Sequence, residues 1–172
     1  MKKLSRFVSV FISVIISVFF ASCADQSVKS PVSVTELSLA ISSAVPLDDG
    51  YYTASESYCK YYFRDESGTS LLGGIVGPEN FTVQKSKSQS SENEFGIFIT
   101  DFQKTKALKS ICEKYIETRK KAYMEAKAAY SPEEFEKFRD AEVFVYDVYV
   151  IYFIMNRSDI NIAKKSVSAL FK

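Results

Sequence analysis

The sequence predicts an α+β fold: a four-stranded, mainly antiparallel sheet in the order β-β-α-β-β-α, with its helices on one face and a short helix before it. Three observations predict this class. Short segments alternate apolar and polar residues as strands do, a long segment repeats apolar residues at helical spacing, and Val148–Met155 is apolar throughout. Residues 33–172 form one predicted domain of ordinary size.

The first predicted element is a short helix that begins after Ser33. Ser33-Val34-Thr35-Glu36 has the spacing of a capping box, in which the serine and the glutamate satisfy free backbone N–H groups. The helix ends at Pro46. Its apolar residues are Leu37, Ala40, Ile41 and Ala44. Residues 47–63 have no clear period, and residues 65–77 contain four glycines and are predicted to form a loop.

Two strands follow. In residues 80–85, Phe81 and Val83 alternate with polar residues, which indicates a strand with one wet face. The polar segment 85–93 is predicted to be a hairpin loop, and Phe95–Ile99 is predicted to form the second strand.

Helical patterns occupy residues 102–140. A helix from Phe102 to Ala129, capped by Asp101, has an apolar stripe that includes Cys112. Ser131-Pro132-Glu133-Glu134 then has the pattern of a second capping box and starts a short helix.

The last hairpin and helix complete the predicted fold. Val143–Tyr146 and Val148–Met155 are apolar strands on either side of Asp147, and Ser158 and Asp159 begin the final helix. Because Val148–Met155 is apolar on both faces, the second face of the sheet must also be covered. The N-terminal helix and residues 51–63 are the candidates, and dimerisation is the alternative.

The N-terminus has the pattern of a signal peptide over residues 1–22. Three basic residues precede Phe7–Ala21, an uncharged apolar run of fifteen residues that is short for a membrane span. Ala21 and Ser22 then precede Cys23, which resembles a bacterial lipobox, where the signal is cut before a cysteine that carries diacylglycerol. Cleavage as an ordinary secretory signal and retention as an uncut anchor are the alternatives. All three interpretations place the domain outside the cytoplasm.

Lipidation would keep the domain at the cell membrane, with the lipid bilayer as partner through acylated Cys23. Two acyl chains hold a protein durably. The tether, residues 23–32, is short, and its nine residues after Cys23 reach about 30 Å when extended. Without residues 1–22 the chain has 19 basic and 21 acidic residues, so no nucleic-acid partner is expected.

Few residues offer catalytic or metal chemistry. The chain has no histidine, which is the commonest general base and zinc ligand, and no cofactor motif is recognised. Cys59 and Cys112 are candidates for a disulfide outside the cytoplasm, although Cys112 also fits a buried helical position. Four tyrosines are candidate ligand-binding residues, since flat rings stack on sugars, or else they cover the sheet: Tyr51, Tyr52, Tyr61 and Tyr62.

Several segments carry a family resemblance. The lipobox, "ENEFGIFITDF", the helical stretch that ends in "YSPEEFEKFRDAEVFV", "YVIYFIM" and the closing "SALFK" resemble an uncharacterised family of bacterial lipoproteins, the domain of unknown function numbered four-three-five-eight. The resemblance covers most of residues 34–172. It implies a lipoprotein of the bacterial envelope, and it carries over no catalytic residue, because the family has no assigned activity.

The expected function is therefore a non-catalytic accessory or binding domain, held at the outer side of the membrane, with an envelope protein or glycan as partner. A cell-wall glycan or carbohydrate-binding module that uses the four tyrosines is one alternative. A secreted enzyme is the other.

Overall fold

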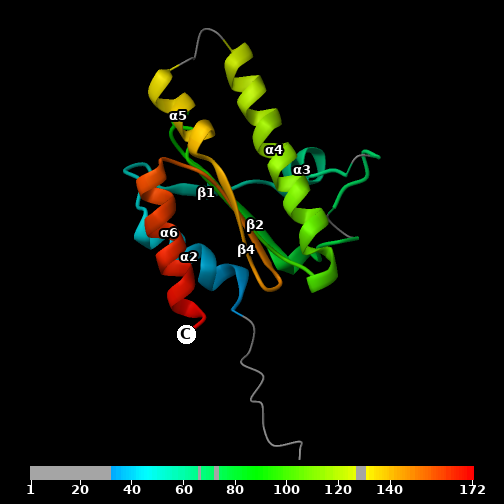
Figure 1. The fold of residues 1–172 in the computed structure, drawn as a ribbon. Helices are drawn as coiled ribbons and strands as arrows, with labels where there is room; N and C mark the ends of the chain where they lie inside the picture. The colour runs from blue at the N-terminus through cyan, green and yellow to red at the C-terminus, as the bar shows by residue number, and fades with distance from the viewer. Residues whose placement is uncertain (1–31, 66, 72–73, 127–130) are drawn as a thin grey trace, which may run out of the picture. The chain divides into compact units, whose positions relative to one another are not determined.

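An antiparallel sheet lies at the centre of the fold (Figure 1). The computed structural model describes residues 32–65, 67–71, 74–126 and 131–172. The five strands are β1 (Tyr51–Thr53), β2 (Phe81–Ser86), β3 (Glu94–Ile99), β4 (Glu142–Tyr146) and β5 (Tyr149–Ile154). Their order in the sheet is β1-β2-β3-β5-β4. The predicted signal peptide, Cys23 and the tether up to residue 31 lie outside the described residues.

Five α-helices are present in the described residues. They are α2 (Val34–Ala44), α3 (Glu56–Tyr62), α4 (Thr105–Glu125), α5 (Pro132–Asp140) and α6 (Arg157–Leu170). Short 3-10 turns, Pro78–Asn80 and Phe102–Lys104, precede β2 and α4. Within the described residues, no helix is both long enough and apolar enough to cross a membrane.

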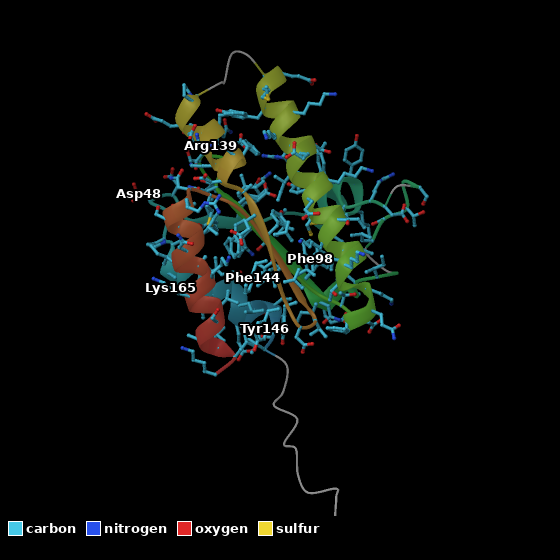
Figure 2. The ribbon with its side chains drawn as sticks, in the orientation of Figure 1. Asp48, Phe98, Arg139, Phe144, Tyr146 and Lys165 are labelled. Carbon is cyan, nitrogen blue, oxygen red and sulfur yellow. The ribbon has the colours of Figure 1, made fainter. Side chains whose placement is uncertain are left out.

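The two faces of the sheet bury separate apolar clusters. One cluster packs Val83, Phe98 and Val150 against α3, α4 and α5. The other packs Phe95 and Ile151 against α2 and α6, which lie side by side. Figure 2 shows the two sides through Phe98, which belongs to the first cluster, and Phe144, which borders the second.

The prediction of helices on one face is therefore wrong, although the α+β class and the antiparallel sheet are confirmed. β3 and β5 are buried along nearly their whole length, so one helical layer would leave the other face open to water. The N-terminal helix does cover the second face, together with α6. The tyrosine-rich segment instead places α3 on the face of α4.

The prediction of four strands is also wrong. The fifth strand, β1, is three residues long and pairs with the end of β2, with Tyr52 opposite Lys85. Gly50 precedes it with φ of 73°, a left-handed conformation that glycine adopts without strain. A strand of three residues is too short to show a period in the sequence.

Helix starts differ in detail from the prediction. The Ser33 capping box is present, and Ser131 accepts from the backbone N–H of Glu134. Asp101 makes no side-chain cap and pairs with Lys104 at 2.8 Å, and α4 begins three residues after Phe102. The predicted last turn of that helix lies partly at residues 127–130, outside the described residues.

Candidate functional site

A buried carboxylate, Glu94, lies at the start of β3 and is 1% exposed. The pleat of the strand directs it, like Gly96 two residues on, toward the face that α4 covers. Its Oε1 accepts hydrogen bonds of 2.5 Å from the hydroxyls of Tyr115 in α4 and Tyr152 in β5. Both are short charge-assisted bonds, which fix the carboxylate in the core.

Gly96 makes room for this arrangement. Tyr152 is directly opposite Gly96 in the β3–β5 ladder, and its ring crosses over the glycine. A Cβ atom at position 96 would lie 2.1 Å from that ring, closer than any real contact. The glycine in "EFGIF" therefore lets the Tyr152 hydroxyl reach Glu94.

Two cations compensate two carboxylates. The ammonium of Lys85 in β2 lies 2.9 Å from Glu94 Oε2, without the alignment of a hydrogen bond. Arg119 Nη2 in α4 lies 2.5 Å from Glu92 and 3.8 Å from Glu94. The four side chains thus have no net charge, and each carboxylate has a cation within 4 Å.

Tyr58 of α3 connects these groups. Its hydroxyl accepts from Lys85 and from Arg119, both at 3.0 Å, and lies 2.7 Å from the Tyr115 hydroxyl. Because Tyr115 gives its own proton to Glu94, Tyr58 must be the donor to Tyr115. The hydrogen-bond order is therefore fixed from Tyr58 through Tyr115 to Glu94.

The network also raises the pKa of four of its members. Burial, with the nearby charge of Glu94, raises the pKa of Tyr115 and of Tyr152 well above the usual range. For Lys85 and Arg119, burial is the largest single influence and opposes the charged form, but the Glu94 carboxylate and the neighbouring tyrosines together outweigh it, so the pKa of each is raised. The phenols remain protonated and the cations charged at neutral pH, so none of these four groups can exchange a proton there as a general acid or base.

A pocket of about 250 Å³ opens beside the network. Arg119, Thr118, Ala122 and Tyr123 line it from α4. Tyr62 of α3 and Glu92 of the β2–β3 loop close it from the other side. The polar network therefore presents an arginine, a glutamate and an aromatic ring to one small hollow.

The loop that carries Glu92 is held by α5. The backbone N–H of Glu92 donates to Glu134 Oε2 at 2.6 Å, and the buried Lys137 ammonium contacts both oxygens of Glu134, at 2.7 and 2.8 Å. Glu134 is therefore not used as the reciprocal cap that its sequence pattern predicted. It positions Glu92 at the pocket.

The structure separates the four predicted ligand-binding tyrosines. Tyr51 and Tyr52 belong to β1: Tyr51 packs edge-on against Phe95 and donates to the carbonyl of Val45, whereas Tyr52 is exposed. Tyr61 and Tyr62 belong to α3 and are 64% and 38% exposed. Of the four, Tyr62 lines the pocket, and Tyr61 lies beside it with their ring planes at 83°.

Sequence reasoning missed the residues that define this site: Tyr58, Lys85, Glu92, Glu94, Tyr115 and Arg119. Two signals for them exist in the sequence. Glu94 is a charged residue at the start of an otherwise apolar strand, and Tyr115 and Arg119 are four residues apart on one side of α4.

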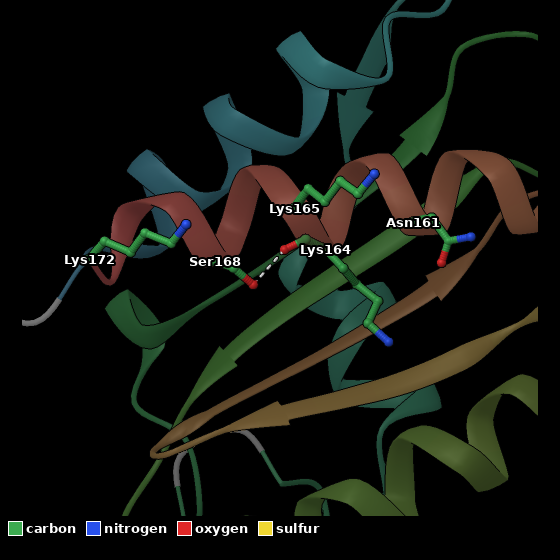
Figure 3. Close-up of a pocket in the computed structure, with 5 residues that line it drawn as sticks. All are labelled: Asn161, Lys164, Lys165, Ser168 and Lys172. Atoms are coloured by element: carbon green, nitrogen blue, oxygen red, sulfur yellow. Dashed lines mark hydrogen bonds between the residues drawn. The ribbon is translucent and has the colours of Figure 1, made fainter.

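A larger hollow follows one exposed side of α6 (Figure 3). Its lining residues all come from this helix and its C-terminal end: Asn161, Lys164, Lys165, Ser168 and Lys172. Lys164 pairs with Glu142 at 2.5 Å, and Ser168 donates to the backbone carbonyl of Lys164. Because no second element encloses it, this hollow is a surface groove rather than a built site.

The two cysteines in the described residues are free and buried. Burial raises the pKa of Cys59 to about 12, and burial also raises the pKa of Cys112. Both side chains belong to the core cluster on the α4 face, where they pack as small apolar groups. Within the described residues, no group of three potential ligands could hold a metal ion.

Comparison with family models, with curated proteins and with solved structures finds no match to this chain. The function is therefore argued from the geometry of the site and from the N-terminal sequence.

Proposed function

We propose that this chain is a lipid-anchored, extracytoplasmic binding domain without catalytic activity, and that its ligand site is the pocket between Tyr62 and Arg119. The observation that carries the proposal is the charge-balanced network beneath the pocket. It holds Arg119 and Glu92 in fixed positions at the surface of the pocket, 2.5 Å apart. Such preorganised polar groups favour binding because little order is lost when a ligand arrives.

Binding is favoured over catalysis by the chemistry of the same groups. The phenols and cations named above keep their protons at neutral pH, and both described thiols are buried away from the pocket with raised pKa values. A nucleophile needs an adjacent base or a lowered pKa. A pocket of this kind recognises a molecule without transforming it.

The membrane anchor rests on the sequence around Cys23. We expect the intact mass of the membrane-extracted protein to correspond to a chain that begins at Cys23 and carries diacylglycerol. The Cys23→Ser variant removes the thiol to which the lipid attaches, so it should lose the added mass and its association with membranes. An unmodified N-terminus at Ala24 or Asp25 would contradict the anchor.

The pocket is tested by filling it. Ala122 lines the pocket, whereas Ala107 is an exposed alanine on the same helix that does not line it. We expect ligand-observed NMR with a panel of carboxylates, amines, nucleosides and sugars to detect a class that binds the parent and Ala107→Phe but not Ala122→Phe. If no class shows this dependence on Ala122, the pocket is not the binding site.

A further inference from the structure

We infer that the pocket binds one uncharged sugar ring. This inference rests on the proposed function, because it names the ligand class of that same pocket. It depends on the charge balance of the pocket, on its hydrogen-bonding groups, and on its small volume together with one exposed aromatic ring.

The charge balance disfavours ionic ligands. Arg119 faces Glu92 at 2.5 Å and Glu94 at 3.8 Å, and Lys85 compensates Glu94 at 2.9 Å. An anionic ligand at Arg119 would lie beside the Glu92 carboxylate, which repels it, and a cationic ligand at Glu92 would lie beside the Arg119 guanidinium in the same way. Displacing either partner instead would leave a partly buried charge unpaired, which is costly. A neutral ligand leaves both pairs intact.

The hydrogen-bonding groups match hydroxyls. A guanidinium has five N–H donors, and Arg119 gives one to Tyr58 and one to Glu92. The Glu92 carboxylate retains acceptor capacity beyond its bond to Arg119, and the Thr118 hydroxyl, which donates to Lys114, can still accept. The pocket therefore offers donors and acceptors side by side. A sugar hydroxyl, which is both a donor and an acceptor, satisfies this mixture, and an aliphatic ligand would leave it unpaired.

The size and the aromatic ring favour a single pyranose. The volume of about 250 Å³ is below the range of roughly 300–1,000 Å³ that drug-sized ligands occupy. Tyr62 is held by Tyr58, with ring centroids 4.5 Å apart, and by Tyr115, at 6.0 Å. Tyr62 is 38% exposed, and its ring gives the pocket a rigid apolar surface beside polar groups. The C–H face of a pyranose can pack on that ring while its hydroxyls meet Arg119 and Glu92.

The test compares three sugars that share one ring and differ in charge: glucose, glucosamine and glucuronic acid. We expect glucose to bind the full-length lipidated protein in detergent at least tenfold more tightly than either charged sugar, measured by NMR titration or calorimetry. We also expect Tyr62→Ala to weaken glucose binding at least tenfold. Tyr52→Ala, which removes an exposed ring on β1 that does not line the pocket, should leave it unchanged.

Each contrary result has a separate meaning. Preference for glucosamine or glucuronic acid would overturn the inference of an uncharged ligand. Equal loss in Tyr52→Ala and Tyr62→Ala would overturn the placement of the sugar on the Tyr62 ring. If none of the sugars binds while another class binds in an Ala122-dependent manner, the sugar inference fails and the proposed binding pocket stands. If nothing binds at all, both fail.

Discussion

Gly96 has a steric role that the strand pattern around it does not reveal. Glycine inside a strand weakens the strand slightly, so an alanine at this position would ordinarily be stabilising. Here the ring of Tyr152 occupies the space above the glycine and carries its hydroxyl to Glu94. Because Gly96 has no side chain, the Tyr152 ring fits above it, and the polar network can form in the core.

We predict that Gly96→Ala destabilises the protein by about 1–3 kcal/mol or more, because the added methyl must displace the Tyr152 ring. The free energy of unfolding in urea measures this. Gly74→Ala is the matched control: nothing lies within 4 Å of a Cβ built there, so its effect should stay within about 0.5 kcal/mol. If the Gly96→Ala variant is as stable as the parent, the Tyr152 ring can adopt another position without loss of stability.

Glu94 and its partners illustrate why a core can contain charge. Burying the four charges opposes folding, and the bonds among them offset that cost only while every member is present. Glu94 accepts hydrogen bonds from two phenol hydroxyls and lies within 4 Å of two cations. Each element that contributes one of these groups therefore has one defined position. We regard register and helix placement, rather than net stability, as the effect of this network.

At the scale of elements, the sequence predicts long periodic segments well and short ones poorly. The first helix, the strands around Val83 and Ile97, the long helix and the final hairpin are all present where their patterns indicate. β1 and α3 are not found in advance, because consecutive tyrosines and a helix of seven residues give no clear period. Tertiary pairing with β2 creates β1.

The choice of face for each helix is a second limit. Periodicity shows which side of a helix is apolar, but β3 and β5 are apolar on both sides and accept a helix on either. Without another constraint, the sequence predicts α4 and α6 on the same face of the sheet. In the structure they cover opposite faces, and α2 completes the layer beside α6.

This placement of α2 makes a matched pair of predictions within one helix. Both leucines belong to α2: Leu37, on the side of the helix that faces the sheet, is 0% exposed, whereas Leu39, on the outer side, is 66% exposed. Leu37→Ala should lower the free energy of unfolding by about 2–5 kcal/mol, since it leaves a cavity in the second core. Leu39→Ala should change it by less than about 0.5 kcal/mol. Similar losses for the two variants, measured in urea, would mean that α2 does not cover that face as described.

At the scale of the whole molecule, the site is harder to foresee than the fold. The buried network joins three separate elements. Tyr115 is 21 residues from Glu94 in the sequence, and Tyr152 is 58 residues from it. The sequence pattern favours adjacent tyrosines, because neighbours in sequence are visible. These candidates include Tyr62 but not the arginine and glutamate that line the same pocket. A pattern within one element cannot report contacts that depend on how β3, β5 and α4 are assembled.

The same assembly predicts how the molecule responds to alkali. Tyr115 and Tyr152 have pKa values raised above 10.0 in the folded state by burial and by the charge of Glu94, while unfolding returns them to about that value. Above about pH 10 the unfolded chain releases phenol protons that the folded chain retains. The stability that these two phenols contribute is therefore fully present below about pH 10 and is lost as the pH rises, by about 1.4 kcal/mol per pH unit for each phenol.

Urea unfolding between about pH 8 and pH 11 measures this dependence. Burial also raises the pKa of the Cys59 thiol from 9.0 to about 12 and raises the pKa of the Cys112 thiol, so each thiol adds a decline of about 1.4 kcal/mol per pH unit that begins near pH 9. Tyr152→Phe removes one phenol, so it should be less stable than the parent at pH 8, because Glu94 loses a donor, and should then fall less steeply above pH 10. Tyrosinate absorbance provides the control, since both buried phenols should ionise only as the chain unfolds. A stability that stays flat through pH 11 would mean that water reaches these hydroxyls and that the network is not sealed in the core.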